Sequence, residues 1–263
     1  MRLSLLGLAA AAVIAFVGTA SAADIQMPVK AAPPPAPTYS WTGCNANVGV
    51  GYGMYDIDHS TTGPGGPYDT GHDNGGRGWL GRVGGGCDYQ FSSSFVIGAF
   101  ADYDWANIHG RYSYNCPGAC AGPATGLGGD LNESSAWSAG ARLGYIVVPQ
   151  LLTYVDGGYR AAHYDSATLG DLSGGTAFSV NLPSQTRSGW FLGGGTEYAL
   201  GWWKGLFWRT EYRFATYGSR TVTTTCNVAS GVGAGCAAGG AQAVDTSKAY
   251  EQTITSSLVW RFW

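Results

Sequence analysis

Charged residues are scarce in this chain of 263 residues, where Lys and Arg number 14 and Asp and Glu number 17. That is about half the charged share of a typical soluble domain, which argues against an ordinary cytosolic enzyme. The net charge of −3 lacks the basic excess of nucleic-acid-binding proteins, so no nucleic-acid partner is expected. Long apolar runs are also missing beyond the extreme N-terminus, which excludes further membrane-spanning helices.

Glycine and aromatic residues are abundant instead, with 43 Gly, 10 Trp, 16 Tyr and 9 Phe. The glycines follow no G-X-Y period, which excludes a collagen-like chain. An apolar share of 45% with so many aromatic residues excludes intrinsic disorder. The composition therefore favours a β-rich protein.

The N-terminus has the pattern of a secretory signal peptide over residues 1–22. A positive start at Arg2 precedes an apolar stretch from Leu3 to Val17, and small residues precede Ala23. The alternative, a retained membrane anchor, needs a longer apolar run of roughly 20 residues. Residues 23–40 are Pro-rich and are expected to form an extended periplasmic segment.

From Trp41 onward, apolar and polar residues alternate with a period of two. Between Cys44 and Met54 the even positions are mostly apolar and the odd positions are Asn or Gly. This period predicts a β-strand with one apolar face. Similar segments predict eight strands, near residues 44–54, 79–91, 95–108, 136–147, 151–163, 187–200, 206–216 and 250–262.

The connections alternate between tight turns and long loops of roughly 23–33 residues, as in outer-membrane barrels. Aromatic residues gather on the apolar face near both strand ends, in two sets that resemble interfacial girdles. The set toward the short turns is Tyr89, Phe91, Phe95, Tyr145, Tyr198, Trp208, Trp260 and Phe262. The set toward the long loops is Tyr52, Trp79, Tyr103, Trp105, Trp137, Tyr159, Trp190 and Tyr212.

These faces decide between two all-β architectures. A soluble β-sandwich or lipocalin-like barrel would carry many Lys, Glu and Thr residues on its polar face, whereas here that face holds glycine and isolated charges. Backbone groups in lipid must all be paired, and only a closed sheet has no edges. We therefore predict an all-β fold over residues 41–263, a closed eight-stranded antiparallel transmembrane β-barrel.

Several segments resemble a known family. The run Tyr39-Ser40-Trp41-Thr42-Gly43, the strand after it and the closing Leu258-Val259-Trp260-Arg261-Phe262 are similar to the small porin-like surface antigens of the alphaproteobacterial outer membrane, relatives of the OmpA transmembrane domain. Cys44 departs from the pattern, since the family usually has an aromatic residue there. The resemblance implies an outer-membrane location with extracellular loops and periplasmic termini, and a structural, adhesive or antigenic role rather than an enzymatic one.

Charged residues of nearly balanced sign fall on the predicted interior face. The set is Arg82, Asp102, Asp104, Arg142, Asp156, Arg160, Glu197, Arg209, Glu211, Arg213 and Glu251. An eight-stranded barrel has room mainly for side chains, and charges in such a space are stable when paired. An ion-pair network that fills the lumen is the favoured interpretation, and a narrow path for small solutes is the alternative.

The four histidines fall in the predicted long connections or at their mouths. No His pair has zinc-ligand spacing, so we expect neither a metal site nor a cofactor. A haem-binding surface protein, as claimed for some relatives of the family, is a less favoured alternative. His163, Asp165 and Ser166 are the nearest approach to a catalytic group, but adjacent strand residues point to opposite faces, so no enzyme is predicted.

Six cysteines in an exported chain indicate disulfide bonds. Their proximity in sequence predicts two pairs inside loops, Cys116 with Cys120 and Cys226 with Cys236. Cys44 and Cys87 share the lipid-facing side and are expected to lie opposite each other. A bridge between them and two free thiols are equally compatible with this placement, because a bridge across a regular ladder is geometrically demanding.

The last two residues, Phe262 and Trp263, resemble the aromatic C-terminal signal that the barrel-assembly machinery reads. The expected partners are therefore that machinery together with outer-membrane lipid and lipopolysaccharide. The oligomeric state and any permeant solute or receptor are not specified by the sequence.

Overall fold

The computed structural model describes residues 40–63, 66–115, 126–172, 179–226 and 241–262. The expected signal peptide and nearly all of the Pro-rich segment lie outside these residues. No helix long and apolar enough to cross a membrane occurs in the described part of the chain.

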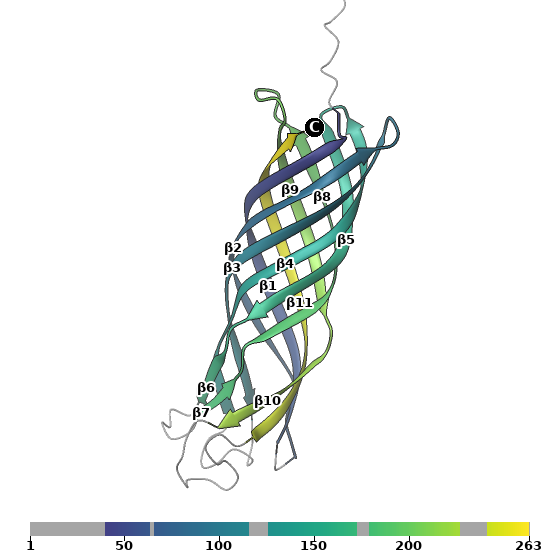
Figure 1. The fold of residues 1–263 in the computed structure, drawn as a ribbon. Coiled ribbons are helices and arrows are strands. Elements are labelled where there is room, and N and C mark those ends of the chain that lie inside the picture. Colours follow the sequence, from purple (N-terminus) through teal and green to yellow (C-terminus); the bar gives the residue numbers. More distant parts are fainter. Residues whose placement is uncertain (1–39, 64–65, 116–125, 173–178, 227–240, 263) are drawn as a thin grey trace, which may run out of the picture. The chain divides into compact units, whose positions relative to one another are not determined.

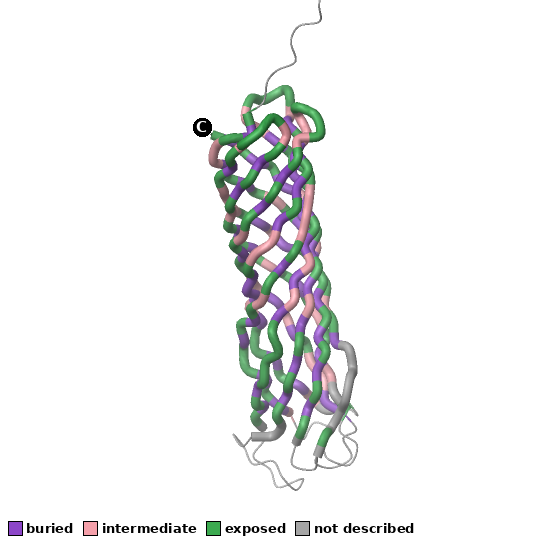
Figure 2. Tube along the Cα trace, turned by 90° about the vertical axis from the view of Figure 1, so that its right-hand side faces the viewer, coloured by how far each residue is buried: buried purple, intermediate pink, exposed green. Residues whose placement is uncertain are grey.

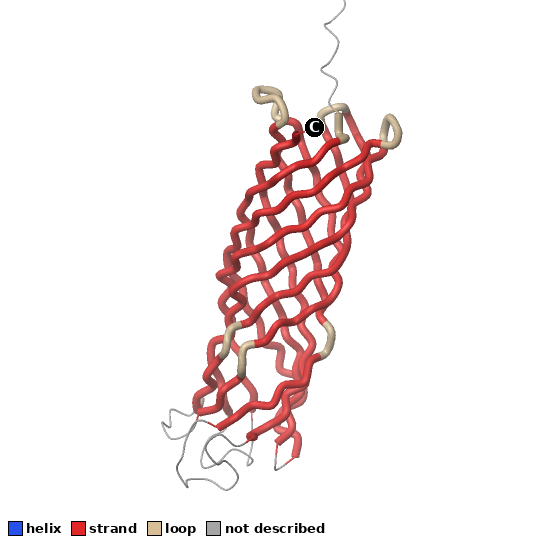
Figure 3. The backbone as a smooth tube through the Cα atoms, viewed as in Figure 1, coloured by secondary structure: helices blue, strands red, loops and turns tan. Residues whose placement is uncertain are grey.

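Eight antiparallel strands form a closed barrel (Figures 1 and 3). They are β1 (Gly43–Gly63), β2 (Gly66–Gln90), β3 (Phe95–Asn115), β4 (Gly126–Val148), β5 (Leu151–Tyr164), β8 (Gln185–Ala199), β9 (Leu206–Tyr217) and β11 (Ala241–Phe262). Each strand pairs with its neighbours in this order, and β1 pairs with β11 to close the ring. The predicted fold class and all eight predicted strands are confirmed.

Three shorter strands continue the barrel beyond the ends of β5, β8 and β9. They are β6 (Ala167–Asp171), β7 (Ser179–Leu182) and β10 (Arg220–Cys226), each separated from its parent strand by only two residues. β6 pairs with β4 and β7, while β10 pairs with β7 and β11. A second closed ring therefore extends the barrel at the end opposite the short turns, and its order is β1-β2-β3-β4-β6-β7-β10-β11. We call this end the upper end of the barrel and the second ring the upper ring; Figure 1 draws them at the bottom.

This second ring corrects the expectation of long loops. Most of each predicted loop is strand, and only residues 64–65 separate β1 from β2. The cause is visible in β1, where the two faces exchange character beyond Met54. On the side of the short turns Val48 and Val50 point outward, whereas toward the second ring Asp56 points outward and Ile57 is buried. The upper ring thus has a polar outer face and an apolar interior, as is typical of an antiparallel sheet with one face in water and the other on a core.

Side chains alternate between buried and exposed along most of the barrel, with a run of three buried residues, Arg160, Ala161 and Ala162, in β5 (Figure 2). Both predicted aromatic sets face outward, and Trp79 and Tyr89 are among the most exposed large apolar side chains. We call the sets that include these two residues the outer girdle and the inner girdle, respectively. The strand segments between them carry the apolar outer band and are the membrane-spanning part of the barrel.

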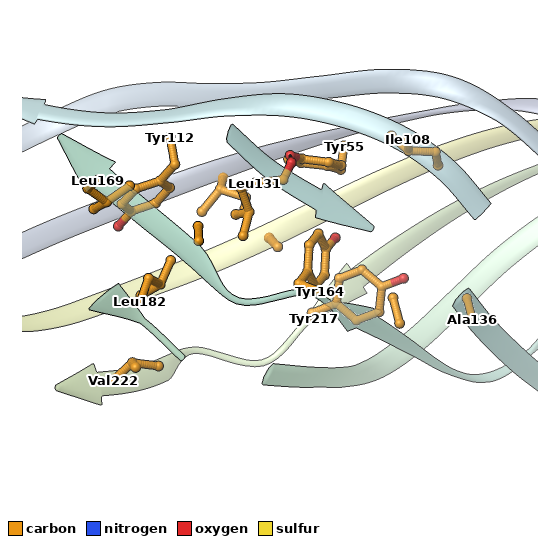
Figure 4. Packing of buried hydrophobic residues seen from close by; sticks show 14 of the residues in the cluster. Tyr55, Ile108, Tyr112, Leu131, Ala136, Tyr164, Leu169, Leu182, Tyr217 and Val222 are labelled. Atoms are coloured by element: carbon orange, nitrogen blue, oxygen red, sulfur yellow. Dashed lines mark hydrogen bonds between the residues drawn. The ribbon is translucent and has the colours of Figure 1, made fainter. Parts of the chain in front are cut away.

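The barrel interior contains two clusters of buried apolar side chains. The upper cluster fills the second ring and the mouth of the first, with Tyr55, Ile57, Tyr112, Leu131 and Leu169 among its members (Figure 4). The lower cluster lies at the end of the short turns and comprises Trp41, Val96, Leu152, Tyr154, Ala199, Phe207 and Val259. Charged side chains lie among the members of the lower cluster and in the space from there to the upper cluster.

Candidate functional site

The structure places every one of the eleven predicted interior charges inside the barrel. Their relative exposure ranges from 0% at Asp104 and Glu197 to 6% at Arg209. They alternate with outward-facing apolar residues on their strands, because neighbouring side chains of a strand point to opposite faces. Together with further charged side chains they form a continuous network, which we describe in three layers from the short turns upward.

The lower layer gathers three arginines around two acids. Glu197 accepts hydrogen bonds from Arg209 at 2.9 Å and from Arg261 at 2.7 Å, and Arg142 lies 3.4 Å away. Asp88 accepts from Arg261 at 2.7 Å and also from Arg142. The layer is thus held from β2, β4, β8, β9 and β11, on opposite sides of the barrel.

The middle layer centres on two further arginines. Arg82 forms a two-pronged ion pair with Asp104 at 2.7 and 2.9 Å and reaches Glu211 at 2.8 Å. Arg213 lies 2.8 Å from the same Glu211 carboxylate. The hydroxyl of Tyr154 donates to the second oxygen of Glu211 at 2.8 Å.

Arg213 also reaches across the barrel, to Asp102 at 2.9 Å and to Asp156 at 2.8 Å. Its guanidinium lies over the rings of Phe100 and Phe191, at 4.7 and 4.8 Å from the ring centres. Aromatic rings and acids therefore enclose this cation from several sides.

The upper layer is organised by Arg160. Its guanidinium donates to Glu251 at 2.6 and 2.8 Å and to Asp104 at 2.8 Å, which links the upper and middle layers. The hydroxyl of Tyr217 donates to Glu251 as well. Glu133 lies 3.9 Å from Arg160, and neither of its carboxylate oxygens has a hydrogen-bond partner in the described part of the chain.

Glu133 lies on β4 four residues beyond the outer-girdle residue Trp137, outside the membrane-spanning segment. Burial raises the pKa of the Glu133 carboxyl well above its ordinary value, and the negative charge of Glu251 raises it further. The partial pairing with Arg160 does not offset the loss of solvation. Burial therefore favours the neutral form of the Glu133 carboxyl.

Sequence reasoning missed three members of the network. Asp88 shares the inward parity of Arg82 on β2, and Arg261 that of Glu251 on β11, so the same alternation could have identified them. Glu133 lay in a predicted loop and could be placed only once β4 was known to extend to Gly126. Glu251 on β11 takes its arginine from a distant strand, because Arg160 on β5 reaches it across the barrel.

The predictions for the cysteines have two different outcomes. Cys44 and Cys87 lie directly opposite each other in the β1–β2 ladder and form a disulfide bond. Of the other four, Cys116, Cys120 and Cys236 lie outside the described residues, as does the side chain of Cys226. The two predicted loop disulfides therefore stay predictions.

The histidines lie on strands rather than in loops. His59 is buried in the upper ring, 3.1 Å from the Asn74 amide, which corrects its expected place in a solvated loop. His109 is exposed on β3. No group of three His, Cys, Asp or Glu side chains with metal-binding geometry occurs within the described ranges.

The suggested catalytic group is only loosely assembled. His163 Nε2 lies 4.0 Å from Asp165 Oδ1, and His163 Nδ1 lies 3.1 Å from the hydroxyl of Thr186. Asp165 Oδ1 instead accepts a hydrogen bond from Ser134 at 2.9 Å. The expectation that the protein is not an enzyme stays a prediction.

The C-terminal aromatic signal lies at the edge of the described chain. Phe262 is the last residue of β11, pairs with Cys44 and faces outward in the inner girdle. Trp263 lies outside the described residues.

The similarity to known proteins agrees with this architecture. The chain is 31% identical over 154 residues to proteins named 31 kDa outer-membrane immunogenic protein from Brucella melitensis and Brucella suis. The match covers 57% of this chain and 58% of each relative, so the chain spans less than two thirds of the length of these curated relatives. No protein-family model matches the chain.

Outer-membrane location follows from this similarity together with the closed barrel and its apolar outer band. The chain is an outer-membrane β-barrel protein. Solved structures with a similar fold include Ail of Yersinia pestis (TM-score 0.33, 11% identity, 83% of this chain and 99% of that chain) and OprG of Pseudomonas aeruginosa (0.48, 12%, 84% and 98%). The protease OmpT of Escherichia coli is also similar (0.43, 10%, 87% and 99%).

Proposed function

We propose that this outer-membrane barrel is a non-conducting surface scaffold, whose interior charges hold the barrel together and do not line a pore. On this proposal the protein belongs with the porin-like surface antigens related to the OmpA transmembrane domain. The second ring then stands at the cell surface and presents the connections between strands to the outside, which fits the immunogenic name of the Brucella relatives.

The observation that carries the proposal is the continuous filling of the lumen. Ion pairs and apolar side chains interdigitate along the barrel from one cluster to the other: Leu152 of the lower cluster lies opposite Glu197, and Tyr217 of the upper cluster donates to Glu251. Arg261 joins the lower cluster to the lower layer, since its guanidinium lies 5.1 Å from the centre of the Trp41 ring and also contacts Glu197. A hydrated ion would have to displace both apolar and paired charged side chains to pass.

The test is electrical recording from protein refolded into planar bilayers, with folding checked by the different gel mobility of boiled and unboiled samples. The proposal expects folded protein without steady open levels. Steady open levels in folded wild-type protein would overturn it and establish the alternative, a narrow porin for small solutes. A titration with haem under the same conditions tests surface haem binding, for which no spectral shift is expected.

A further inference from the structure

A groove of about 840 Å³ lies on the outer surface of the barrel, across β1, β2, β3, β4 and β11. Its lining includes the polar side chains of Asp56, Arg77, His109, Arg111, Asp130 and Asn132. Except for Asn132, which is half-buried, these residues are exposed on the outer face. The groove therefore opens away from the charged interior that the proposed function concerns.

Glycines form the floor of the groove. Gly75, Gly76 and Gly110 line it, and a Cβ at Gly76 would approach the Tyr55 ring to 2.5 Å. A Cβ at Gly110 would come within 2.1 Å of the Tyr55 hydroxyl, which donates to the carbonyl of Leu131. The Tyr55 ring therefore packs directly behind Gly76 and Gly110 on the inner side of the sheet, while the exposed Gly75 leaves the outer face open.

The height of the groove on the barrel places it in a defined layer of the membrane. Met54 and Arg77 lie opposite each other, each two residues beyond the outer-girdle residues Tyr52 and Trp79. Two residues of strand span roughly 7 Å, about the depth of the polar headgroup layer beyond the hydrocarbon core. The edge of the groove at Met54 and Arg77 thus lies at the level of the lipid headgroups, and the groove extends outward from there to Arg111 and Asp130.

The lining combines groups that recognise phosphate with groups that recognise sugar hydroxyls. Arg77 and Arg111 supply guanidinium forks, which suit phosphate oxygens. His109 is held by a 2.9 Å contact between its Nδ1 and Asn132 Oδ1. The carboxylates of Asp56 and Asp130 would repel a bare phosphate but can accept hydrogen bonds from hydroxyls.

A second groove of about 500 Å³ continues this surface and shares Tyr250 with the first. It is lined by the aromatic side chains of Trp190 and Phe214 and by Lys248, whose amine lies 5.0 Å from the centre of the Tyr250 ring. Further cation and aromatic surface at the same level suits an amphiphile that is larger than a single phosphate.

We propose that the first groove binds the phosphorylated sugar headgroup of an outer-leaflet glycolipid, with Arg77 and Arg111 contacting its phosphate. The acyl chains of the same lipid then lie along the apolar band below Trp79 and Val83, which are both exposed outward. The proposal rests on the outer-membrane location, and it assigns the expected lipid partner to one binding site on the barrel. It is independent of whether the barrel conducts.

The test compares binding of bisphosphorylated lipid A and dephosphorylated lipid A to folded full-length protein in detergent. Wild-type protein is expected to bind the phosphorylated form at least ~10-fold more tightly, as one good charge-assisted contact allows. The double variant R77Q/R111Q should lose this preference. The double variant K204Q/R220Q changes the net charge equally at exposed sites outside the groove and should keep it.

A second variant tests whether the lipid occupies the groove without changing the charge of the groove. Gly75→Gln places a side chain in the groove without altering any charge, and it should weaken binding of both lipids. Equal binding of the two lipids by wild-type protein, or an unchanged preference in R77Q/R111Q, would overturn the proposal. Displacement of lipid A by millimolar inorganic phosphate would also overturn it, because the site would then recognise a free anion. Channel activity in the separate recording would reject the scaffold function without affecting this result.

Discussion

Arginine is the cation that organises the interior, and its planar fork explains why. Arg82, Arg142, Arg160, Arg213 and Arg261 each contact at least two acids. A guanidinium can donate in several directions within one plane and stays charged when buried, whereas a lysine amine is a single point charge. Removal of one acid therefore affects more than one cation.

Glu211→Ala tests this sharing. The substitution removes the partner of the Tyr154 hydroxyl and one partner each of Arg82 and Arg213. Breaking a buried pair from one side costs on the order of 3–5 kcal/mol, so the unfolding midpoint in urea should fall clearly. Thr210→Ala, an exposed neighbour on β9, should leave the midpoint unchanged. Equal midpoints for wild type and Glu211→Ala would show that the network contributes little to stability.

For Glu133 we predict the opposite effect, namely that removing the acid raises the stability of the folded protein. Its pKa is raised in the folded protein, while in the unfolded chain it is about 4.3. Above that value the folded state holds a proton that the unfolded state has lost, so stability falls as pH rises toward the folded pKa. Glu133→Gln keeps the neutral shape of the side chain and removes the titration.

The difference in stability between Glu133→Gln and wild type should therefore grow between pH 5 and pH 8, in favour of the variant. Urea unfolding at the two pH values measures this difference directly. Glu197→Gln is the contrasting variant, because Glu197 accepts hydrogen bonds from Arg209 and Arg261 and its loss should destabilise at both pH values. A pH-independent difference for Glu133→Gln would mean that Glu133 is ionised in the folded protein.

The strands themselves show what the sequence could predict. Alternation with a period of two is strong wherever one face meets lipid, and there it identified every membrane-spanning strand and eleven interior charges. Above the outer girdle the outer face becomes polar and the inner face apolar, as at Asp56 and Ile57. The period of two continues there, but the polar and apolar faces are exchanged. A search for strands with an apolar outer face therefore ends β1 too early, at Met54.

Pairing across the barrel could not be predicted for a different reason. Arg160 on β5 meets Glu251 on β11 although the two strands are not neighbours in the sheet. Such contacts depend on the width of the lumen and on the reach of each side chain, and neither is encoded in the period of one strand. The same limit hid the role of Asp88, which Arg142 and Arg261 approach from β4 and β11.

β6 provides a test of the second ring as a separate element. Leu169 is fully buried in the upper cluster, whereas its neighbour Thr168 is exposed. Leu169→Asp places an unpaired charge among apolar side chains, at a cost of several kcal/mol that falls on the short strands β6, β7 and β10. Trypsin added to intact cells should then cleave after the exposed Arg220, while the lower barrel keeps its heat-modifiable mobility. Thr168→Asp should stay resistant, and resistance of both variants would contradict an independently opening second ring.

At the scale of the whole molecule, the interior is a series of barriers. The ion-pair layers and the two apolar clusters interdigitate along one lumen, and any permeating ion must pass all of them. For barriers in series the highest remaining barrier limits the flux. Weakening one layer therefore cannot open the barrel while the others stay intact.

Single substitutions in each layer should for this reason leave the protein electrically silent. Phe207→Ala opens space in the lower cluster, Glu211→Ala in the middle layer and Tyr112→Ala in the upper cluster. Planar-bilayer recording on each folded variant should show no steady open levels, even where the substitution lowers stability. The variant that combines all three should conduct if its gel mobility shows that it still folds. Should a single variant conduct on its own, one narrow constriction and not a filled lumen would separate the two sides of the membrane, and the other layers would already be permeable in the wild-type protein.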